Sequence, residues 1–354
     1  MNNQIIKFGS YYQSSLEYKE PIEWIVLASE GTKILLISKY VIKLLPYHDS
    51  LTAINWSNCS LRNWLNNVFL NEAFSEEEIK HIITTKNRNF DHKYSNSNGG
   101  SKTYDKVFLL SVEELEKYMT DYRCESTPLA MFDNEKEVYW WLRSVGEKSC
   151  SAYNVYRDGR LGQRTVHCSS YGVRPVIWLD LENEDHFIQD EKKYLYFGAY
   201  FQEDNQHKTP IKWRVLEEND HQLFLVSEVG LEYLSFDNNC NSNFCESSIR
   251  SWLNTEFLNH AFNDEEKSLL IQEISLLTFE EALYSFDDRD DRKIEVNPYL
   301  ISINPNLNRF RNYWLKTKGL GDCVMMINGD GSINKGGILA RFGNIIRPTI
   351  VLKK

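Results

Sequence analysis

A concentration of tyrosine and arginine side chains lies near the end of the first half of the chain. These side chains belong to the segment SAYNVYRDGRLGQRTVHCSSYG, and the ones that we predict to contact a ligand are Tyr153, Tyr156, Arg157, Arg164, His167 and Tyr171. Exposed tyrosine and arginine carry much of the binding energy at protein interfaces. The pattern therefore favours non-covalent recognition of a protein or a glycan over bond-making chemistry.

A terminal β-hairpin is expected to hold these side chains. Two strand-like runs flank Asp158-Gly159, and an Asp-Gly pair between such runs is a strong hairpin signal. The following segment GVRPVIWL is typical of a closing strand. The second half has Asp330-Gly331 at the same place but fewer tyrosines and more glycines, so we expect the ligand to bind the first half.

A second cluster combines tryptophan with arginine. An arginine beside Trp140 and Trp141 could bind an anion or a sugar ring. However, Trp141, Arg143 and Arg174 recur 173 positions later as Trp314, Lys316 and Arg347, which favours a role in the core of a repeated scaffold. We therefore assign a structural role to Trp141, Arg143, Arg174, Pro175, Trp314, Arg347 and Pro348, the two prolines fixing the start of the last strand.

The repetition extends over the whole chain. The segments KFGSYYQ, PIEWIVL and SLRNWLNNVF of the first half return as YFGAYFQ, PIKWRVL and SIRSWLNTEF. Trp64 and Trp252, 188 positions apart, show that the period is domain-sized and far longer than a solenoid unit. The sequence thus predicts two copies of one domain, residues 1–186 and 187–354, joined by an acidic linker in which Phe187 and Ile188 are expected to anchor one copy against the other.

Each copy is predicted to be an α+β domain with short strands, a Trp-rich helix, further helices, a terminal hairpin and a closing strand. IEWIVLA and KILLISK have the β-branched and apolar content of strands, with the SEGT turn between them. In the segment 60–74 apolar residues recur at helical spacing, and Ser60 is the expected N-cap. The polar segment 91–105 of copy one is expected to be a loop, and copy two is shorter there.

These features together resemble a known family. The order YWWLRS, then Ala152, Val155, Asp158-Gly159 and GVRPV is similar to the end of a bacterial domain family of unknown function. That ending in turn resembles the C-type-lectin-like fold of formylglycine-generating-enzyme relatives and of retroelement-diversified binding proteins. Copy two departs from the pattern, because Lys316, Thr317 and Ile345 stand where copy one has Arg143, Ser144 and Gly172.

The resemblance implies three functions that can be compared with the residues. Calcium-dependent lectins use Glu-Pro-Asn or Gln-Pro-Asp, and neither tripeptide occurs here. Formylglycine-generating enzymes bind copper through two close cysteines, for which Cys150 and Cys168 are the candidates, although Cys168 has no counterpart in copy two. Retroelement-diversified proteins bind partners through the terminal hairpin, where this chain carries its tyrosines and arginines.

Charge and motif content argue against several other classes. A net charge of −10 and a pI near 5.4 argue against a nucleic-acid-binding protein. No HExxH, CxxC or phosphate-loop motif occurs, so neither a metal nor another cofactor is expected. The chain has no membrane-spanning run of about 18 apolar residues and no leader pattern. We therefore expect a cytoplasmic protein, with a phage particle or non-classical export as alternatives.

Three functional hypotheses remain at the level of the sequence. The leading one is a non-enzymatic recognition protein that binds a protein or glycan on the loops and terminal hairpin of copy one. The others are a copper and cysteine enzyme of the formylglycine-generating type, and a structural subunit, for example a homo-oligomer in a phage or defence assembly. Under the leading hypothesis a Tyr153→Ala, Arg164→Ala, Tyr171→Ala triple mutant should stay folded but lose binding, unless the ligand binds the 91–105 loop or copy two.

Overall fold

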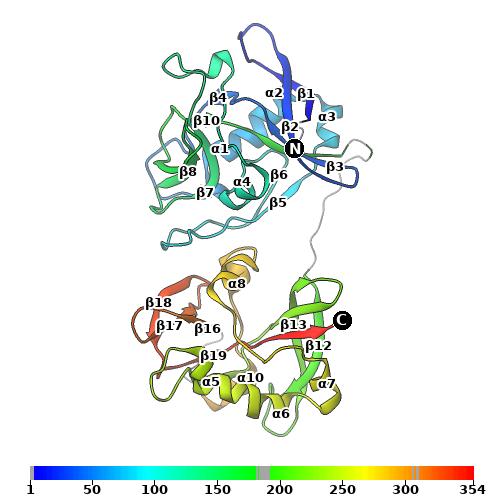
Figure 1. The fold of residues 1–354 in the computed structure, drawn as a ribbon, viewed down its shortest axis with the longest axis vertical. Helices are drawn as coiled ribbons and strands as arrows, with labels where there is room; N and C mark the ends of the chain where they lie inside the picture. The colour runs from blue at the N-terminus through cyan, green and yellow to red at the C-terminus, as the bar shows by residue number, and fades with distance from the viewer. Residues whose placement is uncertain (1–3, 181, 183–191, 305–306, 308–310) are drawn as a thin grey trace. The chain divides into compact units, whose positions relative to one another are not determined.

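The fold was analysed in a computed structural model, which describes residues 4–180, 182, 192–304, 307 and 311–354. The chain forms two compact units, Met1–Gln189 and Asp190–Lys354. Each unit mixes curled β-sheets with short helices (Figure 1). The expected anchors Phe187 and Ile188 lie outside the described residues.

The first sheet of unit 1 has four antiparallel strands. They are β1 (Ile5–Tyr11), β2 (Glu20–Glu30), β3 (Lys33–Ser38) and β11 (Val176–Asp180), hydrogen-bonded in that order. The expected turn between the two N-terminal strands is present, because β2 pairs directly with β3. Trp24 of β2 is fully buried, and its indole N–H donates to the backbone oxygen of Phe8 at 2.8 Å.

The second sheet of unit 1 has five strands and carries the predicted terminal hairpin. Its order is β4 (Lys43–Leu44), β10 (Gly172–Val173), β7 (Trp140–Val145), β8 (Ser151–Val155) and β9 (Leu161–Thr165). Only β10 and β7 run parallel. The hairpin is β8–β9, which turns at residues 156–160 as the Asp-Gly signal predicts. Pro175 separates β10 from the closing strand β11 because it has no N–H to donate.

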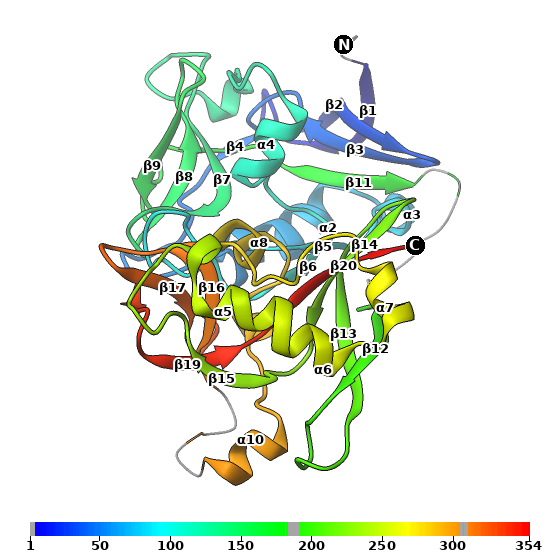
Figure 2. The same cartoon turned by 60° about the horizontal axis from the view of Figure 1, so that its bottom comes forward.

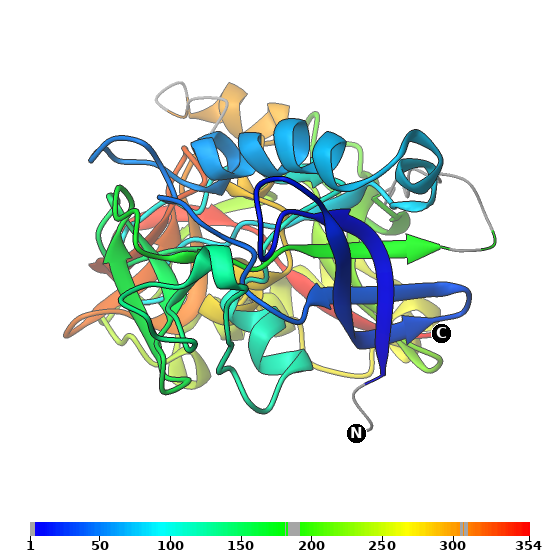
Figure 3. The same ribbon diagram turned by 90° about the horizontal axis from the view of Figure 1, so that it is seen from above.

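The helices of unit 1 cover the first sheet and fill the connections. They are α1 (Ser60–Asn63), α2 (Leu70–Ala73), α3 (Glu76–His81) and α4 (Val112–Tyr118), with 3₁₀ turns at Trp56–Asn58 and Pro128–Ala130 and a π-helical turn at Trp64–Phe69. Figure 3 shows the segment from α1 to α2 running alongside the four-stranded sheet, where Phe69 packs edge-on against Tyr11.

Two expectations about the helix predicted over residues 60–74 are corrected. Cys59, not Ser60, caps α1 by accepting from the Arg62 N–H, and the middle of the helix is π-helical.

An additional segment belongs to unit 1 alone among the described residues. It contains the two-stranded sheet of β5 (Thr85–Asn87) and β6 (Thr103–Asp105). The sequence predicts a polar loop at 91–105, but several of its polar side chains are buried. Asp91, His92 and Asp105 have at most 8% of their surface exposed. We call residues 85–106 the insert.

Unit 2 repeats the two sheets of unit 1 with the same strand order. The four-stranded sheet consists of β12 (Tyr194–Tyr200), β13 (Thr209–Glu218), β14 (Gln222–Ser227) and β20 (Thr349–Lys353), and the five-stranded sheet of β15 (Glu232–Ser235), β19 (Gly343–Ile346), β16 (Tyr313–Lys318), β17 (Cys323–Ile327) and β18 (Ile333–Leu339). Only β16 and β19 are parallel, as β7 and β10 are in unit 1. Sequence positions in the two units can therefore be compared through their strands.

The helices of unit 2 occupy the corresponding connections. They are α5 (Ser248–Trp252), α6 (Leu258–Ala261), α7 (Asp264–Leu269), α8 (Phe279–Tyr284), α9 (Arg289–Arg292) and α10 (Pro298–Ile303), with a 3₁₀ turn at Phe244–Glu246 and a π-helical turn at Leu253–Phe257. Figure 2 shows the segment from α5 to α6 as one continuous helical run, and this segment packs against β15 and β12. Phe257 contacts Tyr200 and Phe262 stacks on Trp213, so the helical segment closes the core of this unit.

Candidate functional site

A cavity of about 430 Å³ opens at the β8–β9 hairpin of unit 1. The residues that line it are Tyr139, Tyr156, Arg157, Asp158, Arg160, Arg164 and Tyr171. Residues 156–160 form the hairpin turn, whereas Tyr139 and Tyr171 immediately precede β7 and β10. The parallel pairing of Gly172 with Trp140 brings these two tyrosines together at the start of their strands. We call this space the hairpin cavity.

Three tyrosine rings form a continuous aromatic wall in the hairpin cavity. The Tyr139 ring lies 5.7 Å from that of Tyr156 and 5.2 Å from that of Tyr171, measured between centroids. The Tyr156 ring packs directly against Gly162 of β9. A side chain at residue 162 would clash with it, because a Cβ atom there would lie 2.3 Å from the ring. The wall is therefore held in position before any ligand arrives, and its half-buried Tyr139 and Tyr156 rings offer flat contact surface.

The charged groups of the hairpin cavity are mostly cationic. Arg157 lies over the Tyr139 ring at 5.2 Å, and its Nε has no hydrogen-bond partner within the described parts of the chain. Arg160 pairs with Asp158 at 2.7 Å, and Arg164 is exposed on β9. Three guanidinium groups thus face one carboxylate, an arrangement that attracts acidic ligands.

Arg164 also influences a cysteine beside the cavity. Burial alone would raise the pKa of the Cys168 thiol, but hydrogen bonds with Ser170 and the Arg164 guanidinium lower it overall. In contrast, burial raises the pKa of the Cys59 thiol to about 12. Cys168 therefore differs in reactivity from the buried Cys59 of the same unit.

Alkylation of Cys168 by iodoacetamide is expected to reach half of its maximal rate at a lower pH than an unperturbed thiol, whose pKa is about 8.5. The Arg164→Gln substitution should raise this pH, since it removes a charge that favours the thiolate. Peptide mapping by mass spectrometry measures the profile. Arg160→Gln is the control, because Arg160 is paired with Asp158 and should leave the profile unchanged. A profile that is the same with and without Arg164 would contradict the assigned contact.

The structure separates the six predicted ligand-binding residues into two groups. Tyr156, Arg157, Arg164 and Tyr171 meet in the hairpin cavity. Tyr153 does not, because alternate residues of a strand face opposite sides of the sheet, and its ring stacks instead on the buried His92 of the insert at 5.8 Å. His167 is exposed beyond the end of β9 and does not line the cavity.

Tyr171 has a different environment from the one expected. It was predicted to be dispensable for folding, but only 6% of its surface is exposed and its ring stacks on Trp141 at 4.6 Å. Burial raises the pKa of its hydroxyl group to about 12. This burial contradicts the expectation that the scaffold does not need Tyr171, so Tyr171→Ala is expected to destabilise unit 1. Substitutions that test binding should leave Tyr171 in place.

Sequence reasoning also missed residues of the cavity. Tyr139 was not predicted as a site residue, although its ring contacts both other rings of the wall. Asp158 was considered only as a turn residue. The period of two along the hairpin was the available signal, since it places Tyr153 and its partner Gln163 on the face opposite to Arg164.

The residues to which the sequence assigns a structural role lie in the cores of the two units. Trp141 and Trp314 are fully buried, and each donates its indole N–H to a backbone oxygen, that of Leu45 at 2.9 Å and that of Leu234 at 3.1 Å. Arg174 and Arg347 are also buried and donate through Nε to the backbone oxygens of Ser38 and Ser227, both at 2.9 Å. Pro348 precedes β20 as Pro175 precedes β11. None of these side chains lines the hairpin cavity.

The cysteines offer little support for a metal centre. Cys150 and Cys168 are both half-buried, and all seven cysteines are free thiols. Throughout the described ranges no group of three or more His, Cys, Asp or Glu side chains is arranged to hold a metal ion.

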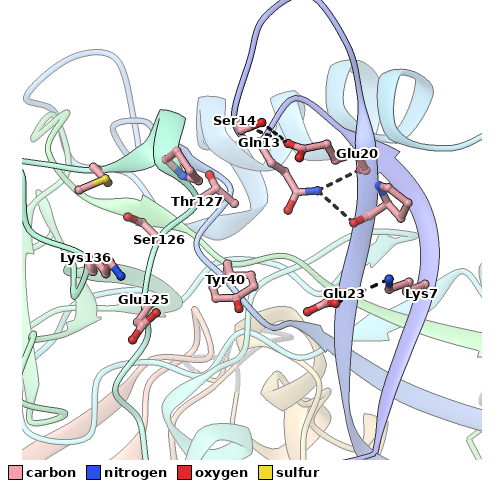
Figure 4. Close-up of a pocket in the computed structure, with 13 residues that line it drawn as sticks. Lys7, Gln13, Ser14, Glu20, Glu23, Tyr40, Glu125, Ser126, Thr127 and Lys136 are labelled. Carbon is pink, nitrogen blue, oxygen red and sulfur yellow. Dashed lines mark hydrogen bonds and ion pairs between the residues drawn. The ribbon is translucent and has the colours of Figure 1, made fainter.

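A second cavity of unit 1, of about 530 Å³, lies between the β1–β2 hairpin and residues 125–136 (Figure 4). Two of its three carboxylates, those of Glu20 and Glu23, are already engaged within the protein. Glu20 accepts hydrogen bonds from the backbone N–H and the hydroxyl of Ser14, both at 2.8 Å, and Glu23 pairs with Lys39 at 2.8 Å. Because these groups satisfy one another, this cavity is a weaker candidate for ligand binding than the hairpin cavity.

The comparisons with known proteins identify a related domain in unit 1. A domain of unknown function (DUF6273) matches residues 31–181, which include the whole hairpin cavity. The expected similarity to a family of unknown function is thereby confirmed for this part of the chain. No curated protein and no solved structure matches the chain. Within the part of the chain that the structure describes, no helix has the length and apolar character needed to cross a membrane.

Proposed function

We propose that unit 1 is a non-enzymatic recognition domain that binds an acidic ligand in the hairpin cavity. The observation that carries this proposal is the meeting of three tyrosines and three arginines around one carboxylate. Arginine and tyrosine together supply both charge-assisted hydrogen bonds and flat apolar contact. The Arg157 guanidinium lies over the Tyr139 ring at 5.2 Å, so a cation and an aromatic ring line the cavity together.

The ligand class follows from this chemistry. A carboxylate would pair with Arg157 or Arg164, while a sugar ring or an apolar side chain would lie on Tyr139 or Tyr156. Both a glycan that contains uronic or sialic acid and an acidic protein segment present these two features. The shared requirement is a carboxylate next to a flat apolar surface.

We also infer that both units are C-type-lectin-like domains that arose by duplication. The support is the WWLRS and GVRP ending, the terminal hairpin and the shared strand order of the two units. In such a scaffold the terminal hairpin and neighbouring loops bind ligands while the sheets stay constant. A cytoplasmic location and a homo-oligomeric state belong to the same hypothesis.

An Arg157→Gln, Arg164→Gln variant of the full chain is expected to bind its ligand at least about tenfold more weakly than the wild type, because each lost charge-assisted hydrogen bond contributes about 1.5–3 kcal/mol. A carboxylated-glycan array and an array of acidic peptides distinguish the two ligand sources. Biolayer interferometry on the strongest hit measures the affinity.

The matched control is Lys80→Gln, Lys148→Gln, which removes the same charge from two exposed positions of unit 1 outside the hairpin cavity. This control should bind as the wild type does. If both variants bound the ligand equally weakly, the loss of affinity would be an effect of net charge alone. If the arginine variant bound as tightly as the wild type, the hairpin cavity would be excluded as the binding site.

A further inference from the structure

Unit 2 contains a cavity of its own, of about 700 Å³, at a different place in the fold from the hairpin cavity. It lies where α5, the 3₁₀ turn before it and β16 meet, and Arg250, Lys316 and Lys318 line it together with Phe244 and Glu273. Three cations thus face one carboxylate. The volume falls within the range of about 300–1,000 Å³ that is typical of small-molecule sites. We call this space the basic cavity.

The equivalent place in unit 1 is filled by the insert. Arg62 and Arg143 stand in unit 1 where Arg250 and Lys316 stand in unit 2. Arg62 binds Asp105 of the insert at 2.6 Å, and Arg143 Nη2 lies 3.4 Å from the backbone oxygen of Arg88. The insert therefore covers in unit 1 the side chains whose counterparts line the basic cavity.

The backbone of the insert also fits closely against this place. A Cβ atom at Gly100 would lie 2.5 Å from Asn55 Oδ1 and 2.8 Å from Ser57 Oγ. Asn243 and Cys245 occupy these two positions in unit 2, and both are exposed there. In unit 1 the connection between α3 and α4 comprises residues 82–111. In unit 2 the corresponding connection between α7 and α8 comprises only residues 270–278, which is too short for a comparable insert.

Asp105 shows what kind of group fits this place. It is buried in unit 1, where it accepts from Arg62, from the indole N–H of Trp56 at 3.1 Å and from the hydroxyl of Thr103 at 2.7 Å. In unit 2 Arg250 pairs instead with Glu273, an exposed side chain at the rim. Unit 1 therefore has a buried carboxylate at this place, that of Asp105, whereas the basic cavity of unit 2 is lined by no buried acid.

We propose that the basic cavity of unit 2 binds a small organic or inorganic anion of the phosphate or carboxylate class. The anion would lie beside Arg250, which is already paired with Glu273, and would contact Lys316 and Lys318. Lys318 has no ion-pair partner in the described ranges, and Lys316 donates only to the Ser275 hydroxyl at 3.3 Å, so both ammonium groups can turn to the ligand. The half-buried Phe244 offers a ring against which the remainder of an organic anion would lie.

Cys245 provides a reporter within the basic cavity, because it is exposed and lines the space. Inorganic pyrophosphate is expected to slow the alkylation of Cys245 by the neutral reagent iodoacetamide in a saturable manner. In the Lys316→Gln, Lys318→Gln variant the pyrophosphate concentration for half-protection should rise at least about tenfold, because two charge-assisted contacts are lost. Peptide mapping of the full chain gives the rate at Cys245 alone.

The control variant is Lys212→Gln, Lys353→Gln, which removes two lysines of unit 2 that do not line the basic cavity and should change half-protection by less than about twofold. Circular dichroism verifies folding. If the first double variant is unfolded, Lys318→Gln alone, at an exposed position, should still weaken protection about threefold. Absent or non-saturable protection, or equal weakening in both double variants, would overturn the proposal.

Discussion

Replacement of Trp141 by alanine is expected to lower the free energy of unfolding of unit 1 by about 3–5 kcal/mol. Trp141 is fully buried, and its ring contacts Tyr171 at 4.6 Å and Tyr47 at 5.7 Å. Alanine would leave a cavity between these rings and an unpaired backbone oxygen at Leu45, which now accepts from the indole. Because the chain has two units, hydrogen exchange of unit 1 amides should be measured alongside denaturation by urea.

The control for this substitution is Tyr94→Ala, since Tyr94 is 80% exposed and should change the stability by no more than about 0.5 kcal/mol. The Trp141 variant should also lose the hairpin cavity, because Tyr171 loses the ring on which it stacks. A loss of less than about 1 kcal/mol would mean that the core at Trp141 can collapse around alanine.

The second large effect is expected at Arg143. Arg143→Gln should destabilise unit 1 by about 1.5–3 kcal/mol, because it removes the charge-assisted hydrogen bonds between the buried guanidinium and the partly buried Glu114. The guanidinium is 3% exposed, forms two hydrogen bonds with Glu114 and donates to the backbone oxygen of Leu109 at 2.8 Å. Urea denaturation with hydrogen exchange in β7 and α4 measures the change.

Lys316→Gln is the matched control, since Lys316 occupies the equivalent strand position in unit 2. It is only half-buried and donates to one hydroxyl, so its loss should alter stability by about 0.5 kcal/mol or less. Similar losses of stability in the Arg143 and Lys316 variants would contradict this prediction, because they would show that both units depend on the position to the same extent.

The sequence predicted the parts of the fold that depend on local signals. Strand propensity and the Asp158-Gly159 turn identify the terminal hairpin, and repetition of Trp141 and Trp314 identifies core positions. The π-helical turn at Trp64–Phe69 was not predicted, since apolar residues at helical spacing are compatible with either kind of turn.

The parts of the candidate site that the sequence did not predict depend on contacts between distant residues. The burial of Tyr171 results from its stacking on a strand that precedes it by 30 positions, which no local pattern reveals. Likewise the buried ion pair of Arg62 with Asp105 joins residues 43 positions apart, so the insert could only be predicted as a polar loop. Cavities arise from such long-range packing and therefore have no signature in a single sequence.

The strands β1 and β2 precede the matched segment in the sequence but belong to the first sheet of the same unit, so a shortened protein has to keep them. The segment that matches the domain of unknown function starts at residue 31, immediately after β2, whereas β2 supplies the hydrogen-bonding partner of β3 and the buried Trp24. A protein shortened to the matched segment would leave one edge of β3 open along the apolar residues 34–37. Open apolar edges of this kind pair with other chains and promote aggregation. The smallest self-sufficient unit therefore includes the strands β1 and β2.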